Sequence, residues 1–380
     1  MLNKKMAKIT YYLGAGASYN ACPILEKQAE MMIALARMEL TVQGESGGMT
    51  TPYLFIESER NLLPNDNIIK ILWHIGYFGK QAQSFNTIDT YARKLKLSGT
   101  DSELNLLKMS ISVFFDLWEN FYEERYSHFF LDPENEIRYK NIDYRYTSLF
   151  SVLLERERLK LTINDSFKFI TWNYDLQLES TFQSFMRENE VKDLNQLNQY
   201  FFPFMENNEQ DNDVYHLNGH RGFFKEEERI FQIKNNISYE QYWSGVDWLF
   251  KSTEKNSADF HKYIKYAWEH DIKSEWFERI SKILRETEVL VIIGYSFPPF
   301  NRSIDQFLFS RLDSKKIKKI VYQDPNGNKQ IIENLFKDPD LFKDKIFIEK
   351  ESMNQFHLPN EHFIKQKNIP LDFNSVNLIP

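Results

Sequence analysis

Cysteine is almost absent from this chain of 380 residues, which contains only Cys22. A single cysteine excludes a disulfide framework within the chain and any zinc site built on paired thiolates. Long apolar runs are also missing, since the longest, Val289–Ile293, is far too short to cross a bilayer. The first residues include lysines but no apolar stretch of the length that a secretory signal needs. We therefore expect a soluble, cytoplasmic protein that binds neither a membrane nor a metal.

An excess of basic residues is missing as well. The chain has 47 Lys and Arg against 54 Asp and Glu, a formal net charge of −7. This balance lacks the basic footprint of a protein that binds nucleic acid directly. Aromatic residues make up 16% of the sequence, enough to fill a core and to exclude general disorder. The length predicts about two structural units, or one large domain with an insertion.

Six short β-rich runs alternate with helical patterns along the chain. They are Ile9–Leu13, Phe167–Thr171, Asp213–Leu217, Val289–Ile293, Lys319–Tyr322 and, more weakly, Lys345–Glu349. Continuous apolar strands between helices indicate a parallel sheet that is covered on both faces. The predicted fold class is α/β, a Rossmann-like, mainly parallel sheet with helices on both faces, plus a large α-helical insertion. In such sheets ligands bind at the carboxyl ends of the strands.

The stretch between the first two predicted strands is too long for one crossover and is mostly helical in pattern. Ile24–Leu40 is rich in helix formers, and Thr100 with Glu103 is a candidate capping box before a long apolar stripe. A further helix is predicted over Tyr144–Leu159. The predicted division has three parts. A Rossmann-type sheet domain covers 1–51 and 161–350, a helical insertion covers 52–160, and a partner-docking or loosely ordered tail covers 351–380.

The sequence Gly14-Ala15-Gly16-Ala17-Ser18 follows the first predicted strand. Glycines at this place let the backbone approach a pyrophosphate group. The dehydrogenase fingerprint needs a further glycine where Tyr19 stands, and an acidic residue that ends a second strand about 20 residues on. These departures disfavour a hydride-transfer enzyme. A tight strand-to-helix turn without a ligand remains the alternative.

Two further motifs follow the second and third predicted strands. In Thr171-Trp172-Asn173-Tyr174-Asp175, the amide of Asn173 and the carboxylate of Asp175 would face one cleft. The alternative is that Asp175 caps a helix over Leu176–Met186. In Val214–His220, His216 and Asn218 share a face if the strand stays extended. A histidine at a strand end is often structural, but beside the preceding motif an acid–base role competes with that interpretation.

The last two motifs follow the fourth and fifth predicted strands. Gly294 and Ser296 offer a small residue and a hydroxyl to a ribose or a phosphate, and Asp324 offers a carboxylate. Each motif is weak by itself. Five strand ends with ligand-type residues in one α/β sheet are a stronger signal.

In this order and spacing, the five motifs resemble those of the sirtuin-like superfamily, and are most similar to its bacterial anti-phage branch, whose members hydrolyse NAD. The resemblance covers about residues 1–30 and 160–330. It implies that Asn173 positions the nicotinamide ribose or the attacking water and that Asp175 holds the nicotinamide carboxamide. It implies that the phosphates and the adjoining ribose of NAD are contacted by Gly14, Ala15, Gly16 and Ser18. It implies that the adenosine half is lined by Ser296 and Asp324. The remaining contacts to the cofactor would come from Thr171 and Gly294.

The chain also departs from the family pattern. Classical deacetylases carry Gln where Trp172 stands, and they have four zinc-binding cysteines, so protein deacetylation is not expected. The family's catalytic histidine immediately precedes the glycine, where this chain has Asn218. His216 is the favoured general base because a shift of two residues keeps the same side of a strand. His220, or a loss of catalysis, stays open.

The expected function is that of an NAD glycohydrolase, with NAD as substrate, ADP-ribose and nicotinamide as products, and no metal. The resemblance implies the NAD-depleting effector of an anti-phage, abortive-infection system. Because NAD depletion must be restrained, we expect a low-activity resting state and a homo-oligomer. The activating partner would be a hexameric DNA-translocase-type ATPase, an Argonaute-like protein or a phage protein. The alternatives are a non-catalytic sensor of NAD or ADP-ribose, and a scaffold subunit with a merely structural sheet.

Overall fold

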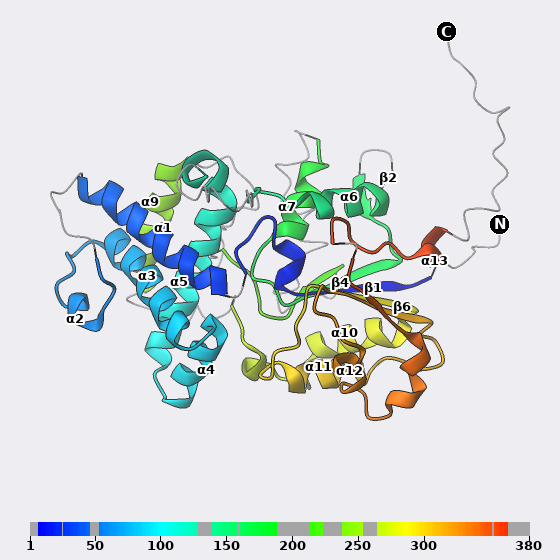
Figure 1. The fold of residues 1–380 in the computed structure, drawn as a ribbon. Coiled ribbons are helices and arrows are strands. Elements are labelled where there is room, and N and C mark those ends of the chain that lie inside the picture. The colour runs from blue at the N-terminus through cyan, green and yellow to red at the C-terminus, as the bar shows by residue number, and fades with distance from the viewer. Residues whose placement is uncertain are drawn as a thin grey trace, which may run out of the picture.

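The computed structural model describes residues 7–24, 26–45, 53–127, 139–157, 160–187, 213–222, 238–253, 264–351 and 353–363. These residues form a six-stranded parallel sheet with helices on both faces, which confirms the predicted α/β class (Figure 1). The strands of this sheet are β1 (Ile9–Leu13), β4 (Phe167–Thr171), β5 (Val214–His216), β6 (Val289–Ile293), β7 (Lys319–Gln323) and β8 (Ile346–Glu349).

The strand order across the sheet is β5-β4-β1-β6-β7-β8. Counted along the chain within this sheet, that order is 3-2-1-4-5-6, as in doubly wound dinucleotide-binding sheets. The winding reverses between β1 and β6, and ligands of such folds bind outside the carboxyl ends at this switch point. Leu13 pairs with both Thr171 and Ile293, so the three central strands end level with one another.

Each face of the sheet is buried under helices. Ile9, Tyr11 and Leu13 of β1 pack in one apolar cluster on the side of α6 (Tyr144–Leu153) and α7 (Gln177–Ser184). Tyr12 packs in another cluster on the opposite side, which is covered by α10 (Glu275–Glu286), α11 (Arg302–Phe309) and α12 (Lys329–Glu333). Burial on both faces explains why the strand sequences are continuously apolar rather than alternating.

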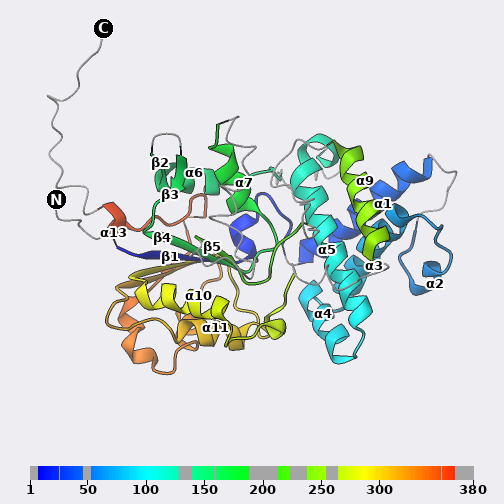
Figure 2. The same ribbon diagram turned by 180° about the vertical axis from the view of Figure 1, so that it is seen from behind.

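A separate helical layer lies beyond the carboxyl ends of the strands (Figures 1 and 2). It has its own apolar cluster and contains α1 (Glu26–Glu45), α3 (Asn67–Ser84), α4 (Ile88–Leu97), α5 (Asp101–Phe121) and α9 (Tyr239–Thr253). The short α2 (Glu57–Arg60) lies at its outer edge. Of these helices, α1 and α9 fall outside the predicted insertion 52–160, whereas α6 falls inside it and covers the sheet. The layer is thus assembled from separate stretches of the chain.

Two local predictions were wrong. The helix predicted over Tyr144–Leu159 ends at Leu153, because the next residues form β2 (Leu154–Glu157), which pairs antiparallel with β3 (Lys160–Ile163). Thr100 does precede α5, but no capping box forms. Its hydroxyl donates to the Leu95 carbonyl at 3.1 Å, while Glu103 binds Arg60 at 2.7 Å.

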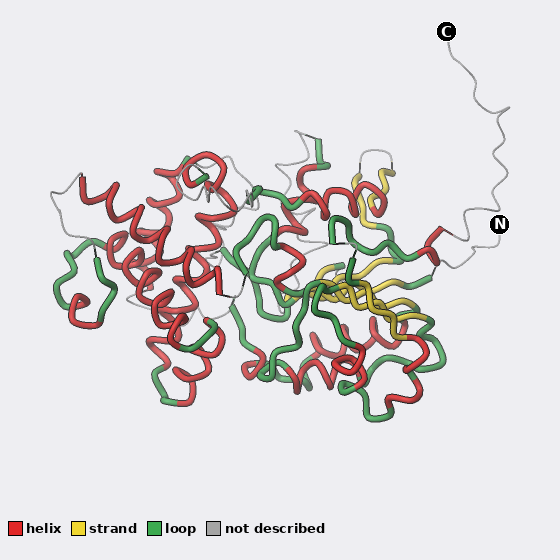
Figure 3. Tube along the Cα trace, viewed as in Figure 1, coloured by secondary structure: helices red, strands yellow, loops and turns green. Residues whose placement is uncertain are grey.

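Figure 3 shows how the helices, strands and loops of the described residues are distributed. Short turns of other helix types complete this secondary structure. They are the 3₁₀ turns η1 (Ala15–Ser18), η4 (Ala267–Glu269), η5 (Pro339–Leu341) and η6 (Lys343–Lys345), and a π turn that continues α5, η2 (Tyr122–Tyr126). Among the described residues, no helix combines the length and the apolarity that crossing a membrane requires.

The first part of the predicted C-terminal tail packs back onto the sheet. Phe356 is buried, and the His357 carbonyl accepts a hydrogen bond from the Tyr11 hydroxyl at 3.0 Å. The Gln355 carbonyl accepts a hydrogen bond from the Gln323 side chain at 2.7 Å. A last short helix, α13 (Asn360–Phe363), follows. Residues 353–363 are therefore part of the folded sheet domain, whereas 364–380 lie outside the described residues.

Candidate functional site

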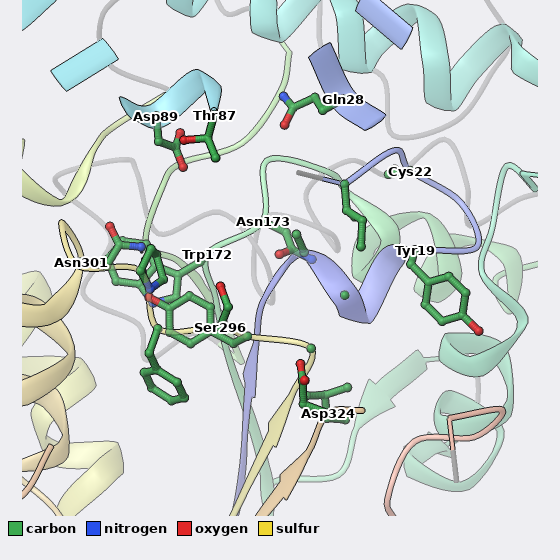
Figure 4. Close-up of a pocket in the computed structure, with 18 of the residues that line it drawn as sticks. Tyr19, Cys22, Gln28, Thr87, Asp89, Trp172, Asn173, Ser296, Asn301 and Asp324 are labelled. Carbon is green, nitrogen blue, oxygen red and sulfur yellow. Dashed lines mark hydrogen bonds between the residues drawn. The ribbon is translucent and has the colours of Figure 1, made fainter. Parts of the chain in front are cut away.

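A cavity of about 830 Å³ lies between the carboxyl edge of the sheet and the helical layer (Figure 4). Strand-end loops form one side of it, and α1, α4 and α5 contribute to the other. Seven of the residues predicted from the sequence line this cavity: Ala15, Gly16, Asn173, Asp175, Gly294, Ser296 and Asp324. Four predicted residues are not among its lining: Gly14, Ser18, Thr171 and His216.

The glycines after β1 are explained by close contact between two loops. A Cβ atom on Gly14 would lie 2.6 Å from the Gly294 carbonyl oxygen, and one on Gly16 would lie 2.8 Å from the Gly294 Cα. The Gly16 N–H donates to the Gly294 carbonyl at 2.9 Å. These backbone groups serve the junction of β1 and β6, so the tight-turn interpretation accounts for both glycines. A phosphate at this turn would have to use the remaining N–H groups of η1.

Replacing Gly294 by alanine is expected to destabilise the protein by about 3 kcal/mol or more. Gly294 has a φ of +58°, and an added Cβ would lie 2.4 Å from the Ala17 nitrogen. Gly99 is a matched control because its φ is +70° and nothing lies within 4 Å of an added Cβ. Gly99→Ala should therefore cost only the conformational part, about 1–2 kcal/mol. Denaturant unfolding measures both, and equal costs would contradict the close contact.

Asn173 has a buried amide oxygen without a partner. Its backbone N–H donates to Thr171 Oγ1 at 3.0 Å, and its side-chain Nδ2 donates to Ser18 Oγ at 3.1 Å. Among the described residues its Oδ1 finds no hydrogen-bond partner, although Asn173 is only 6% exposed. An unsatisfied buried acceptor costs about 1–3 kcal/mol. The site thus fits a ligand that donates a hydrogen bond to Oδ1. The backbone N–H and the side-chain Nδ2 of Asn173 are held by Thr171 and Ser18.

Asp175 lies at the cavity and also just before the start of α7. It lines the cavity, and its Oδ1 accepts the Gln177 N–H at the start of α7 at 3.2 Å. Burial raises the pKa of Asp175 to about 7, and the nearby Glu119 carboxylate raises it as well. Both effects favour the protonated form of the Asp175 carboxyl group.

His216 lies behind Asn173 instead of facing the cavity. Its Nε2 is 2.6 Å from Glu179 Oε1, and its Nδ1 is 3.4 Å from the Asn173 carbonyl oxygen. Burial would lower the pKa of His216, but the Glu179 carboxylate raises it. The expectation that His216 faces the ligand assumed an extended strand as far as Asn218. β5 ends at His216 and the chain then turns, so that Asn218 lines the cavity and His216 does not.

His220 is not among the lining residues either. It is fully buried, with Nδ1 2.6 Å from the Arg221 carbonyl oxygen. Burial, with the neighbouring His216, lowers the pKa of His220 to about 3. His220 is thus a neutral side chain of the interior. Asn218, which lines the cavity, donates from Nδ2 to the Trp172 carbonyl at 2.8 Å.

A buried charged network ties helix α5 to the loops of the site. Glu119 accepts the Leu176 N–H at 3.1 Å and the Gln177 side-chain amide at 2.7 Å, and it pairs with Arg221. Arg221 also pairs with Asp116 at 2.8 Å. Sequence analysis missed this network. The available signal was two acidic residues, three apart, within the apolar stripe of a predicted helix.

A second buried carboxylate supports the opposite side of the cavity. Asp305 accepts hydrogen bonds from Tyr12 Oη at 2.6 Å, Tyr295 Oη at 3.0 Å and Trp172 Nε1 at 3.2 Å. Trp172 and Tyr295 stack at 6.0 Å and both line the cavity. Burial raises the pKa of Asp305 to about 7, although the three hydrogen bonds lower it. Asp305 thus holds Trp172 and Tyr295, two aromatic residues that line the cavity, by hydrogen bonds.

The raised pKa of Asp305 predicts a specific pH dependence of stability. Because its folded-state pKa of about 7 exceeds the ordinary 3.8, its stabilising contribution is complete at low pH and is lost as the pH rises through 7. Asp305→Asn resembles the protonated acid and lacks this titration. The wild type should therefore lose stability relative to this variant between pH 4.5 and 7, by at most about 1.4 kcal/mol per pH unit. Thermal unfolding measures the difference, and exposed Asp340→Asn is the control. A pH-independent difference would contradict the buried titration.

Charge on the cavity lining is mainly negative. Among the described lining residues Arg145 is the only cation, and its Nη2 lies 2.5 Å from Asp143 Oδ2 and donates to the Ala17 carbonyl at 2.9 Å. Asp324, half-buried after β7, accepts the Asn326 N–H at 2.8 Å, and burial raises its pKa. Exposed Ser296 lies on the same side of the cavity (Figure 4).

The fold and the cavity define an α/β protein of the doubly wound, Rossmann-like class. A scan against protein-family models gives no match, and a search of curated proteins gives none either. The resemblance to the sirtuin-like superfamily therefore rests on the motifs named above. Within the described residues, no group of three or more His, Cys, Asp or Glu side chains is arranged to hold a metal ion.

Proposed function

We propose that the cavity binds NAD and cleaves the bond between nicotinamide and ribose, which releases nicotinamide and ADP-ribose. The observation that carries this proposal is the unpartnered Oδ1 of Asn173, buried beside a cavity at the switch point of the sheet. A volume of about 830 Å³ lies in the range of small-molecule and cofactor sites. Asn218, Gly294 and Asp324, from three further strand ends, line the same cavity.

The proposed chemistry follows from where each group lies. As nicotinamide leaves, the ribose carbon C1′ gains positive charge and the attacking water must be held close to it. Asn173 Oδ1 would accept a hydrogen bond from a ribose hydroxyl or from that water, and Asp175 would hold the carboxamide. Positioned contacts of this kind remove part of the barrier by orienting the reactants. His216, which lies behind Asn173, would keep its backbone carbonyl in place instead of touching NAD.

The phosphates are the part of NAD for which the cavity lining offers the least obvious binding partners. Arg145 is already paired with Asp143, and the glycine N–H groups serve the β1–β6 junction. We therefore propose that backbone N–H groups of η1 and of the loop after β6, together with water, bind the pyrophosphate. The carboxylate of Asp324 would accept ribose hydroxyls of the adenosine half.

The experiment that tests this proposal measures the release of nicotinamide from NAD by the purified chain, with chromatography to detect the product.

The second candidate function is a sensor that binds NAD or ADP-ribose without cleaving it. It is favoured by one observation, that neither His216 nor His220 lines the cavity. Nucleotide binding without release would select the sensor.

We also propose, from the resemblance alone, a biological setting. The protein would be the NAD-depleting effector of an anti-phage, abortive-infection system, kept at low activity until a homo-oligomer or a partner releases it. The partner would be a hexameric DNA-translocase-type ATPase, an Argonaute-like protein or a phage protein. Specific activity measured against protein concentration, with and without such a partner, tests this restraint. Rapid hydrolysis by an isolated monomer would contradict it.

A further inference from the structure

The proposed hydrolysis needs a group that takes a proton from the attacking water. The two histidines considered from the sequence do not line the cavity. Among the described lining residues, the carboxyl groups that could accept this proton are Asp89, Asp175 and Asp324. The three differ in their place around the cavity and in the groups that bind each carboxylate.

Asp175 and Asp324 are both held by backbone groups of their own loops. Asp175 is 6% exposed, accepts the Gln177 N–H and interacts with the Ser18 hydroxyl. Asp324 accepts the Asn326 N–H and lies at the end of the cavity away from the helical layer (Figure 4). In the proposed function Asp175 also holds the carboxamide and Asp324 binds the adenosine half, so both carboxylates already have another role.

Asp89 lies on the helical side, across the cavity from Asn173 (Figure 4). It is in the first turn of α4, which Thr87 caps by accepting the Thr90 N–H at 3.1 Å. The Tyr174 hydroxyl donates to Asp89 Oδ1 at 2.8 Å. Within the described part of the chain, no hydrogen bond to the other oxygen, Oδ2, is found.

Tyr174 connects this carboxylate to the reacting centre. It stands between Asn173 and Asp175 in the chain, and its ring packs against Phe115 of α5 at a centroid distance of 6.0 Å. With its hydroxyl on Oδ1, Tyr174 holds the carboxylate of Asp89, a residue that lines the cavity. This contact gives the tyrosine of the motif a role that the sequence did not suggest.

We propose that Asp89, contributed by the helical layer, is the general base of the reaction and that Tyr174 is its positioning residue. This inference rests on the proposed NAD hydrolysis. The water oxygen bonds to C1′, the C1′–N bond breaks with its electron pair going to the nicotinamide nitrogen, and the water proton passes to Asp89 Oδ2. Burial raises the pKa of Asp89 to about 6, which keeps the group mostly ionised yet basic at neutral pH.

The test compares water with azide, a nucleophile that carries no proton to lose. Asp89→Asn should lower hydrolysis by about 10²–10⁴-fold, the usual contribution of a general base, with little change in KM for NAD. Added azide should restore nicotinamide release in this variant and yield ADP-ribosyl azide. Tyr174→Phe should lower kcat less and respond to azide in the same direction. Asp101→Asn, at an exposed carboxylate, is the matched control and should behave as the wild type.

The outcomes separate this inference from the proposed function. If the wild type releases nicotinamide and Asp89→Asn does so at the same rate, the assignment of Asp89 is wrong and the hydrolase stands. A loss of release that azide does not restore would also overturn it, because Asp89 would then act on binding or structure. If the wild type itself releases no nicotinamide, the proposed function fails and this inference fails with it.

Discussion

Asn173→Ala is expected to lower nicotinamide release from NAD by about 10²–10³-fold, the loss seen when one placed polar group of a transition-state site is removed. The variant removes a buried amide oxygen that has no hydrogen-bond partner among the described residues, which by itself favours the folded state. It also removes one hydrogen bond, from Nδ2 to Ser18. The fold should therefore be retained, with a melting temperature within a few degrees of the wild type. Initial rates and thermal unfolding measure the two effects.

The control for this variant is Asn61→Ala, at an exposed residue outside the cavity lining. It should match the wild type in both rate and stability. ADP-ribose should still stabilise Asn173→Ala, by roughly 2.7 kcal/mol at 100 times its dissociation constant. Wild-type turnover by Asn173→Ala would contradict the assignment of this residue, whatever its stability.

Arg221→Met is expected to lower the free energy of unfolding by about 3–5 kcal/mol, as for other buried ion pairs that lose one partner. The substitution leaves the carboxylates of Glu119 and Asp116 buried without their cation. Nicotinamide release should fall as well, because Glu119 loses its cation and it is Glu119 that accepts the Leu176 N–H just before α7. Urea unfolding followed by tryptophan fluorescence measures the stability.

Arg285→Met is the matched control, since Arg285 pairs with Glu278 at the surface and both side chains are largely exposed. An exposed pair contributes about 0–1 kcal/mol, so this variant should unfold almost as the wild type does. If Arg221→Met cost no more than Arg285→Met, the network could not be what fastens helix α5 to the site.

The strands could be predicted closely because each is a short apolar run buried on both faces. Ile9–Leu13, Phe167–Thr171 and Val289–Ile293 match the observed strands residue for residue. The make-up of the helical layer could not be predicted in the same way. An apolar stripe on a helix shows which face is buried but not which helix it packs against. The sequence therefore did not show that α1 and α9 pack in one layer with the helices of the insertion.

The site could be predicted in part, for a physical reason. The carboxyl ends of parallel strands meet at one edge, so polar residues that follow separate strands come together, as Asn173, Ser296 and Asp324 do. Asp89 reaches the same cavity from a helix that is far away in the sequence, and no local pattern marks it. His216 was misplaced because the alternation of a strand ends where the strand ends.

The most direct measurement of the central claim is a single-turnover reaction, with the purified chain in excess over NAD so that even a restrained enzyme completes one cycle. The proposed function predicts equal amounts of nicotinamide and ADP-ribose, formed by the wild type and not by Asn173→Ala. NAD recovered intact, while ADP-ribose still raises the melting temperature, would contradict it and identify the cavity as the binding site of a nucleotide sensor.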